Sequence, residues 1–142
     1  GLVFMFCGGP LAYKSKIQST VSTSSTEAGF LAAVHAAKIA KYLRSILLEL
    51  DTRSSADHAF EDNAAAILMV NANRPTPRAR HIDIQHFALQ EWKAAKEIVL
   101  SHIPDVINSA DSLTKSLGST LHHRHVRRLM GHYGAPWTPP VP

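Results

Sequence analysis

The chain has 142 residues, of which 45% are hydrophobic and 18% charged, a composition that fits one folded domain and excludes wholesale disorder. No apolar run approaches the ~18 residues of a membrane helix, and the first residues lack the basic stretch of a signal peptide, so we expect no membrane partner. The single cysteine, Cys7, cannot form a disulfide within the chain, which favours a reducing, intracellular setting.

Charge is distributed unevenly along the chain. Positions 1–73 hold six Lys and Arg and six Asp and Glu, whereas positions 74–142 hold nine and five. No acidic residue follows Asp111, although basic residues continue to Arg128. This one-ended excess indicates either a surface that faces a polyanion or a solvated terminal helix, and charge alone favours neither.

The first part of the chain predicts a β-hairpin followed by a long helix. The apolar run 2–7 ends at Gly-Gly-Pro, as a strand does before a turn, and 11–21 is expected to be the second strand. Ser24 and Glu27 have the spacing of a capping box. Apolar residues at spacings of three or four then predict a helix over about 25–50. Its expected apolar stripe comprises Ala32, Ala36, Ile39, Leu43, Ile46 and Leu50.

The second part of the chain alternates strands and helices. A strand, helix, strand order implies at least one parallel pairing. With the hairpin, this predicts an α/β domain with a mixed sheet over residues 1–131. The expected elements are strands over 57–61 and 97–103, helices over 64–71, 81–96, about 108–117 and about 120–130, a connector at 74–78 and a Pro-rich tail at 132–142.

Three acidic residues stand where predicted strands meet predicted helices: Glu27, Asp62 and Asp111. Nucleases that use two metal ions gather several carboxylates, because Mg²⁺ prefers oxygen ligands and bridges the scissile phosphate. Two of the three also have a local explanation. Glu27 completes the capping box, and Asp111 opens a helix three residues after the capping candidate Asn108. The residues alone favour these local explanations over a metal cluster.

Five motifs in order resemble the ribonuclease H domain of copia-type retrotransposon Pol polyproteins, and together they cover about residues 1–131. The matching stretches are 1–10 (GYVF…GGP in the family), 14–21 with 24–28 (WKSKKQSTV and SSTEAE), 61–67 (CDNxxAI), 80–84 with Phe87 (KHIDIRxHF), and 103–104 with 110–115 (VP and ADILTK).

The resemblance implies a ribonuclease H fold, in which a mixed five-stranded sheet carries helices on its faces. It also implies hydrolysis of the RNA strand of an RNA–DNA hybrid during reverse transcription, with Mg²⁺, or Mn²⁺ in its place. Glu27, Asp62 and Asp111 match three of the family's four metal-binding carboxylates. The fourth lies on the family's first strand, before the segment that Gly1 opens, so we expect an N-terminally truncated domain that lacks this strand and is inactive by itself.

The resemblance also implies partners and a location. The partners are the RNA–DNA hybrid and an upstream reverse transcriptase domain of the same polyprotein, in a cytoplasmic particle or the nucleus. The basic residues expected to contact the hybrid are Lys115, Arg124, Arg127 and Arg128.

Four positions depart from the family pattern without removing a matched ligand. Gly29 replaces Glu, Glu61 replaces Cys, Ser112 replaces Ile and Tyr13 replaces Trp. They indicate a diverged or decaying copy, so an alternative is a catalytically inactive remnant that binds nucleic acid or only folds. A third alternative, another ribonuclease H-like protein such as an integrase core, fits the STEA and ADxLTK context less well.

Four further sites carry weaker signals. Asp83 is better explained as an acid favoured at a helix N-terminus than as a ligand. Local packing explains His81 better than a contact with the hybrid. His102 matches a product-release histidine of some ribonucleases H only if it faces the site, which the sequence does not decide. The run 122–125, with three histidines, lacks the partners of a four-ligand zinc site and is excluded.

Overall fold

A computed structural model describes residues 1–18, 22, 24–50, 57–72 and 80–132, with the side chains of 80–83 outside the description. The chain forms two compact units. The first comprises Gly1–Val21 and Ile103–Pro142, and the second comprises Ser22–His102. Among the described residues, no helix is both long and apolar enough to cross a membrane.

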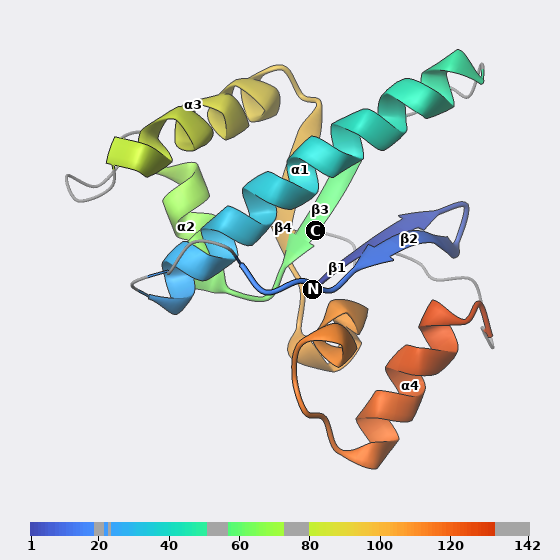
Figure 1. The fold of residues 1–142 in the computed structure, drawn as a ribbon. Helices are drawn as coiled ribbons and strands as arrows, with labels where there is room; N and C mark the ends of the chain where they lie inside the picture. The colour runs from blue at the N-terminus through green and yellow to red at the C-terminus, as the bar shows by residue number, and fades with distance from the viewer. Residues whose placement is uncertain (19–21, 23, 51–56, 73–79, 133–142) are drawn as a thin grey trace. The chain divides into compact units, whose positions relative to one another are not determined.

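The first unit begins with the predicted hairpin, β1 (Leu2–Phe6) and β2 (Gly9–Lys14) (Figure 1). The strands are antiparallel, and Phe6 faces Gly9 across a two-residue turn. Both turn residues, Cys7 (φ 50°) and Gly8 (φ 80°), lie in the left-handed region. This conformation matches the right-handed twist of the flanking strands. The prediction put the turn at Gly-Gly-Pro and the second strand at 11–21, but Gly9 and Pro10 already belong to β2, which ends at Lys14. Positions 19–21 of the predicted strand lie outside the described residues.

The first unit continues with the short 3₁₀ helices η1 (Asp105–Ile107) and η2 (Ser109–Leu113) and ends in α4 (Ser119–Leu129). The sequence predicted one helix over about 108–117 in place of η1 and η2. Asn108 separates them, because it ends η1 and its side chain accepts a hydrogen bond from the N–H of Ala110 to start η2. Both η2 and β2 pack against α4.

The second unit contains α1 (Ser25–Glu49), β3 (Asp57–Glu61), α2 (Ala64–Asn71), α3 (Arg80–Ala94) and β4 (Ile98–His102). As predicted, β3 and β4 pair in parallel. Helix α1 runs along this pair, with α2 and α3 beside it (Figure 1). The buried core of this unit consists of Phe30, Val34, Ala37, Val70, Leu89 and Ile98.

The predicted apolar stripe of α1 was out of phase with the buried face. The buried positions are Phe30, Ala33, Val34 and Ala37, whereas Leu50 is 69% exposed. The last turns of α1 project beyond β3 and β4 (Figure 1), and Leu48 and Leu50 in these turns are 53% and 69% exposed. The prediction assumed a buried apolar face along the whole helix, whereas the buried residues all lie in its first half.

The α/β class is confirmed, but the described residues do not form one mixed sheet. They form two separate two-stranded sheets, β1–β2 and β3–β4. A single sheet would need a strand with hydrogen bonds to both pairs, and none of the described strands has them.

Helix α3 holds the C-terminal end of α2 through side chains spaced along one of its faces. The His86 ring nitrogen Nε2 lies 3.1 Å from the carbonyl oxygen of Ala72, and Gln90 donates to that oxygen and to the carbonyl of Val70. These bonds satisfy carbonyls that a helix end leaves without intrahelical partners. They explain why His86, which is 2% exposed, is buried in this unit.

Candidate metal centre

Glu27 lies in the first turn of α1, and its side chain is buried, with 7% exposed. The predicted cap is confirmed, because the backbone N–H of Glu27 donates to the Ser24 hydroxyl oxygen at 3.1 Å. The helix N-terminus favours a negative charge at this position. The cap thus fixes the backbone of a residue whose carboxylate is on the buried face of the helix.

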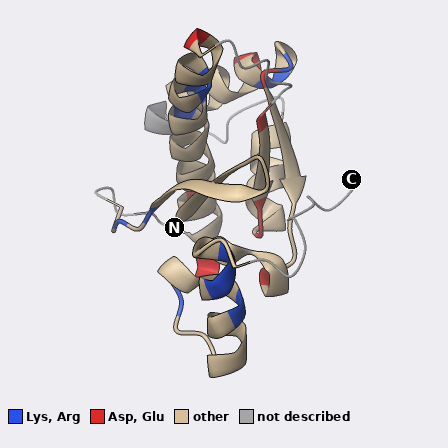
Figure 2. Cartoon of the chain, turned by 90° about the vertical axis from the view of Figure 1, so that its right-hand side faces the viewer, with Lys and Arg blue, Asp and Glu red and all other residues tan. Residues whose placement is uncertain are grey.

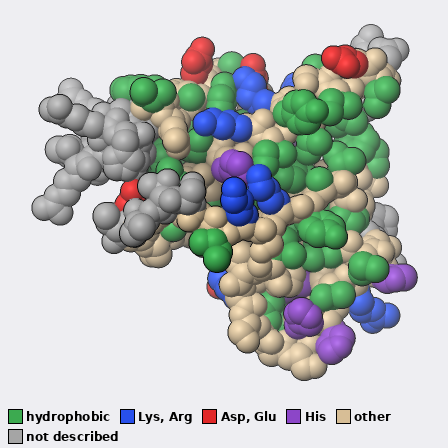
Figure 3. All heavy atoms as spheres, viewed as in Figure 1, with side chains coloured by type: hydrophobic (Ala, Val, Ile, Leu, Met, Phe, Trp, Pro, Cys, Tyr) green, Lys and Arg blue, Asp and Glu red, His purple; other side chains and the backbone are tan. Residues whose placement is uncertain are grey.

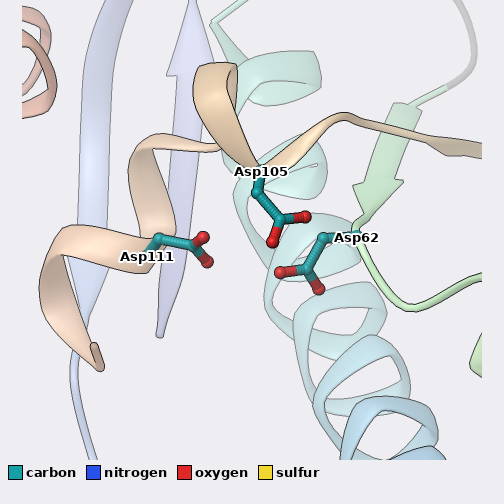
Figure 4. Close-up of side chains that lie close together, drawn as sticks. All are labelled: Asp62, Asp105 and Asp111. Carbon is teal, nitrogen blue, oxygen red and sulfur yellow. The ribbon is translucent and has the colours of Figure 1, made fainter. Parts of the chain in front are cut away.

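Asp62 follows directly on β3 and is half-buried (Figure 4). The next residue, Asn63, caps α2, and its side-chain oxygen accepts from the N–H groups of Ala65 and Ala66 at 3.0 and 3.1 Å. Its amide nitrogen donates to the carbonyl of Ser25 at 3.3 Å. This bond ties the start of α2 to the start of α1. Asp62 and the first turn of α1 therefore belong to the same end of the second unit.

Gly29 and Glu61, which both depart from the family pattern, are neighbours in space. A Cβ atom at position 29 would lie 3.1 Å from Glu61 Oε1 and 3.0 Å from the Cβ of Ala66. Any side chain at position 29 would therefore press on α2 and on the Glu61 carboxyl. The absence of a side chain at one position accommodates the acidic side chain at the other.

Glu61 is an acidic group that is protonated at unusually high pH. Burial raises its pKa to about 7, helped by the negative charge of Asp62 and a hydrogen bond to it, while the N–H of Asn63 acts in the opposite direction. That N–H donates to Glu61 Oε1 at 3.3 Å. Near neutral pH, Glu61 exchanges a proton next to a proposed metal ligand.

Asp111 lies in η2 of the first unit and is 4% exposed. Asn108 Nδ2 donates to its Oδ1 at 3.0 Å, and Lys115 Nζ donates to its Oδ2 at 2.9 Å. A buried carboxylate is destabilising unless a counter-ion and hydrogen bonds compensate it. Both side-chain oxygens of Asp111 have such partners, so the carboxylate is held in one orientation.

Asp105, in η1 of the same unit, is a residue that the sequence analysis missed. Ligand oxygens of Asp105 and Asp111 lie within 4.8 Å of each other, and both side chains are labelled in Figure 4. Lys115 Nζ lies 3.9 Å from Asp105 Oδ2. Asp105 directly follows Pro104, but the resemblance covers residues 103–104 and 110–115 and leaves position 105 unassigned.

In each unit the candidate donors are carboxylate oxygens, a type of ligand that suits a hard divalent cation such as Mg²⁺ or Mn²⁺. Glu27 and Asp62 belong to the second unit, and Asp105 and Asp111 to the first. The side chains of His81 and Asp83 lie outside the described residues. His102 ends β4 opposite Glu61 in the parallel register, and its side chain is exposed.

The basic residues expected to contact nucleic acid lie in three different environments. Arg124 and Arg127 are exposed on α4, whose sequence contains no acidic residue. Figures 2 and 3 show basic residues (blue) on the part of the chain that holds this helix. Arg128 is half-buried, and its guanidinium donates to the carbonyl of Ile107 at 3.1 Å. Lys115 is paired with Asp111. Within α4, only the first two arginines are fully available to a partner.

His125 faces inward from α4 and is fully buried. Neither of its ring nitrogens has a hydrogen-bond partner among the described residues. Burial lowers the pKa of His125, and the positive charges of Arg128 and Arg124 lower it further. His122 and His123 are exposed on the same helix. The three histidines of this run therefore lie in different environments, one buried and two exposed.

Comparison with known proteins gives a retroelement relative. Over 115 residues, 81% of this chain, the sequence is 30% identical to the retrovirus-related Pol polyprotein from transposon TNT 1-94 of Nicotiana tabacum. The chain spans 9% of that relative's length. No model of a protein family matches the chain, and no solved structure matches it. The chain therefore derives from the Pol region of a retroelement.

Proposed function

We propose that this chain is the ribonuclease H region of a copia-type Pol polyprotein and supplies carboxylates for Mg²⁺-dependent hydrolysis of RNA in an RNA–DNA hybrid. The observation that carries the proposal is burial. Among the described residues, Glu27 and Asp111 are the two buried acidic side chains. Both are positions that the family motifs match to metal ligands. Buried acids are rare unless a function or a partner retains them.

The residues around the carboxylates hold them ready for a cation. The Ser24 cap fixes the backbone of Glu27, the Asn63 cap follows directly on Asp62, and Asn108 orients Asp111. When bound, Mg²⁺ would activate the attacking water and stabilise the leaving 3′-oxygen. Asp105 is the additional carboxylate in the first unit, next to Asp111.

Arg124 and Arg127 are the proposed contacts to the phosphates of the hybrid. Both are exposed on a helix without acidic residues, and phosphate contacts by basic side chains supply much of the affinity for nucleic acids. The proposed partner within the polyprotein is an upstream reverse transcriptase domain, which would deliver the hybrid.

The test is cleavage by a longer polypeptide that includes the strand which the resemblance places before Gly1. With Mg²⁺, it should cut the RNA strand of a hybrid, and Asp62→Asn should lower the rate at least about 100-fold, because a lost ligand costs more than the 10–100-fold of a lost supporting group. The matched control is Asp57→Asn at the other end of β3, which should stay within about twofold of the unsubstituted chain. No cleavage, or full activity of Asp62→Asn, would contradict the proposal.

A second candidate function is nucleic-acid binding without catalysis. The observation that favours it is the altered pair Gly29 and Glu61, which places an acid with a raised pKa beside Asp62. In that case the longer polypeptide would bind the hybrid in a salt-dependent manner and leave its RNA intact at all Mg²⁺ concentrations.

A further inference from the structure

The position of Lys115 is that of a cation bound between two carboxylates. Its Nζ lies 2.9 Å from Oδ2 of Asp111 and 3.9 Å from Oδ2 of Asp105. The ligand oxygens of these two aspartates lie within 4.8 Å of each other. Two negative charges at this distance repel each other, so the ammonium group stabilises their approach.

The local backbone delivers Lys115 to this position. The backbone N–H of Lys115 donates to the carbonyl of Asp111 at 2.8 Å and closes a helical turn. This turn places the Lys115 side chain next to that of Asp111, four residues earlier. Asn108 holds the other oxygen of Asp111. Oδ2 is therefore the oxygen to which a positive ion binds in this structure.

Lys115 can leave this position without a change of the backbone. Its side chain is 46% exposed, and that of Asp105 is 70% exposed. A lysine ammonium group sits on a flexible four-carbon stem. A divalent cation at Asp111 Oδ2 and a lysine ammonium at the same oxygen would repel each other, so the two exclude each other.

We propose that Lys115 is an internal counter-ion that keeps Asp105 and Asp111 together without metal, and that a divalent cation binds by displacing it from Asp111 Oδ2. This inference rests on the proposed metal centre and adds its regulation. Lys115 lowers the affinity for metal. Once displaced, its ammonium is available to a phosphate, so binding of the metal and of a phosphate-bearing substrate strengthen each other.

The experiment is calorimetric titration of Mn²⁺ into the 142-residue chain. Lys115→Gln should bind Mn²⁺ about tenfold more tightly than the unsubstituted chain, because a competing charge has been removed. Lys115→Arg, which keeps the charge, should not bind more tightly. The matched control is Lys41→Gln, since Lys41 also pairs with an acid, Glu97, at 2.7 Å. It should leave Mn²⁺ affinity unchanged.

The outcomes separate this inference from the proposed function. Equal or weaker binding by Lys115→Gln would overturn the role of Lys115 and leave the metal centre standing. No Mn²⁺ binding by any of these proteins would overturn both.

NMR spectra of the unsubstituted chain with ¹³C-labelled lysine provide a second test, which does not require a stable variant. The ε-carbon signal of Lys115 should shift on addition of Mg²⁺ while that of Lys41 does not, and an unchanged Lys115 signal in a Mg²⁺-bound chain would overturn the inference.

Discussion

At the scale of single residues, the contact between Gly29 and Glu61 shows how a substitution far along the chain can change the surroundings of a proposed ligand. A Cβ at position 29 would lie 3.1 Å from Glu61 Oε1, so a side chain there would displace the Glu61 carboxyl. Burial of this carboxyl is the main cause of its raised pKa. The charge next to Asp62 is therefore set by packing between α1 and α2.

The raised pKa of Glu61 predicts that stability falls as pH rises. Its folded pKa is about 7, against 4.5 for an unperturbed glutamate, so the folded state binds more protons between these values. Stability should decline from pH 5 to pH 8 by about 1–3 kcal/mol, allowing for solvent screening at this partly buried carboxyl. Glu61→Gln should remove this part of the decline, as urea unfolding across the pH range would measure.

The control for this prediction is Glu49→Gln at the exposed end of α1, which should retain the pH dependence of the unsubstituted chain. Equal pH dependence for Glu61→Gln and the unsubstituted chain would show that Glu61 does not carry the proton.

Residue-scale features that depend on near neighbours in sequence were predictable. The cap of Ser24 on Glu27 follows from a spacing of three residues, and the structure confirms it. Asp105 was not predictable, because its relevance comes from its distance to Asp111 across two 3₁₀ turns. Nor did the sequence reveal that Lys115 pairs with Asp111, although the spacing of four residues permits such a pair.

At the scale of elements, the arginines of α4 differ in their surroundings, which the sequence does not reveal. The guanidinium of Arg128 is engaged with the carbonyl of Ile107, whereas Arg124 and Arg127 are exposed. Of these three arginines, only the latter two are exposed enough to bind phosphates and so release counter-ions from a polyanion.

Replacing both Arg124 and Arg127 by Gln should therefore flatten the salt dependence of hybrid binding. Each phosphate contact contributes about −0.9 to the slope of log K against log salt for duplex DNA, so the slope should change by up to about 2. Fluorescence anisotropy at several KCl concentrations measures it. Arg128→Gln is the comparison: it should lower thermal stability and leave the slope nearly unchanged. An unaltered slope in the double variant would assign α4 to packing alone.

The positions of most elements were predictable, because they rest on local signals. The start of α2 after Asn63 carries a cap residue that acts on the adjacent backbone. The hairpin was also predicted, but its turn was placed at Gly8-Gly9-Pro10, whereas the structure has it at Cys7 and Gly8. The buried phase of α1 was not predictable, since its apolar residues continue beyond the strands that bury the first half. Periodicity identifies an apolar face but not how much of it another layer covers.

At the scale of the whole molecule, the sequence did not predict the two compact units or the two separate sheets. The first unit joins both ends of the chain, Gly1–Val21 and Ile103–Pro142, through contacts such as the Ser15 hydroxyl donating to the carbonyl of Leu113 at 2.8 Å. Contacts between segments nearly 100 residues apart leave no periodic signal. The resemblance places a further strand before Gly1, and we expect the longer polypeptide to contain it.

The last prediction concerns cleavage by the 142-residue chain itself. Two metal ions bridged by a phosphate need nearly all of their carboxylate ligands, and the family motifs supply three of four here. We therefore expect this chain to cleave the RNA of a hybrid in Mg²⁺ far more slowly than the polypeptide extended through the preceding strand, as measured with a labelled hybrid. Comparable cleavage by the two would contradict the prediction and would assign the fourth ligand to a residue within the chain. Asp105 is then the first candidate, because it lies beside Asp111. In that event Asp105→Asn should abolish cleavage by the short chain, whereas Asp57→Asn should not.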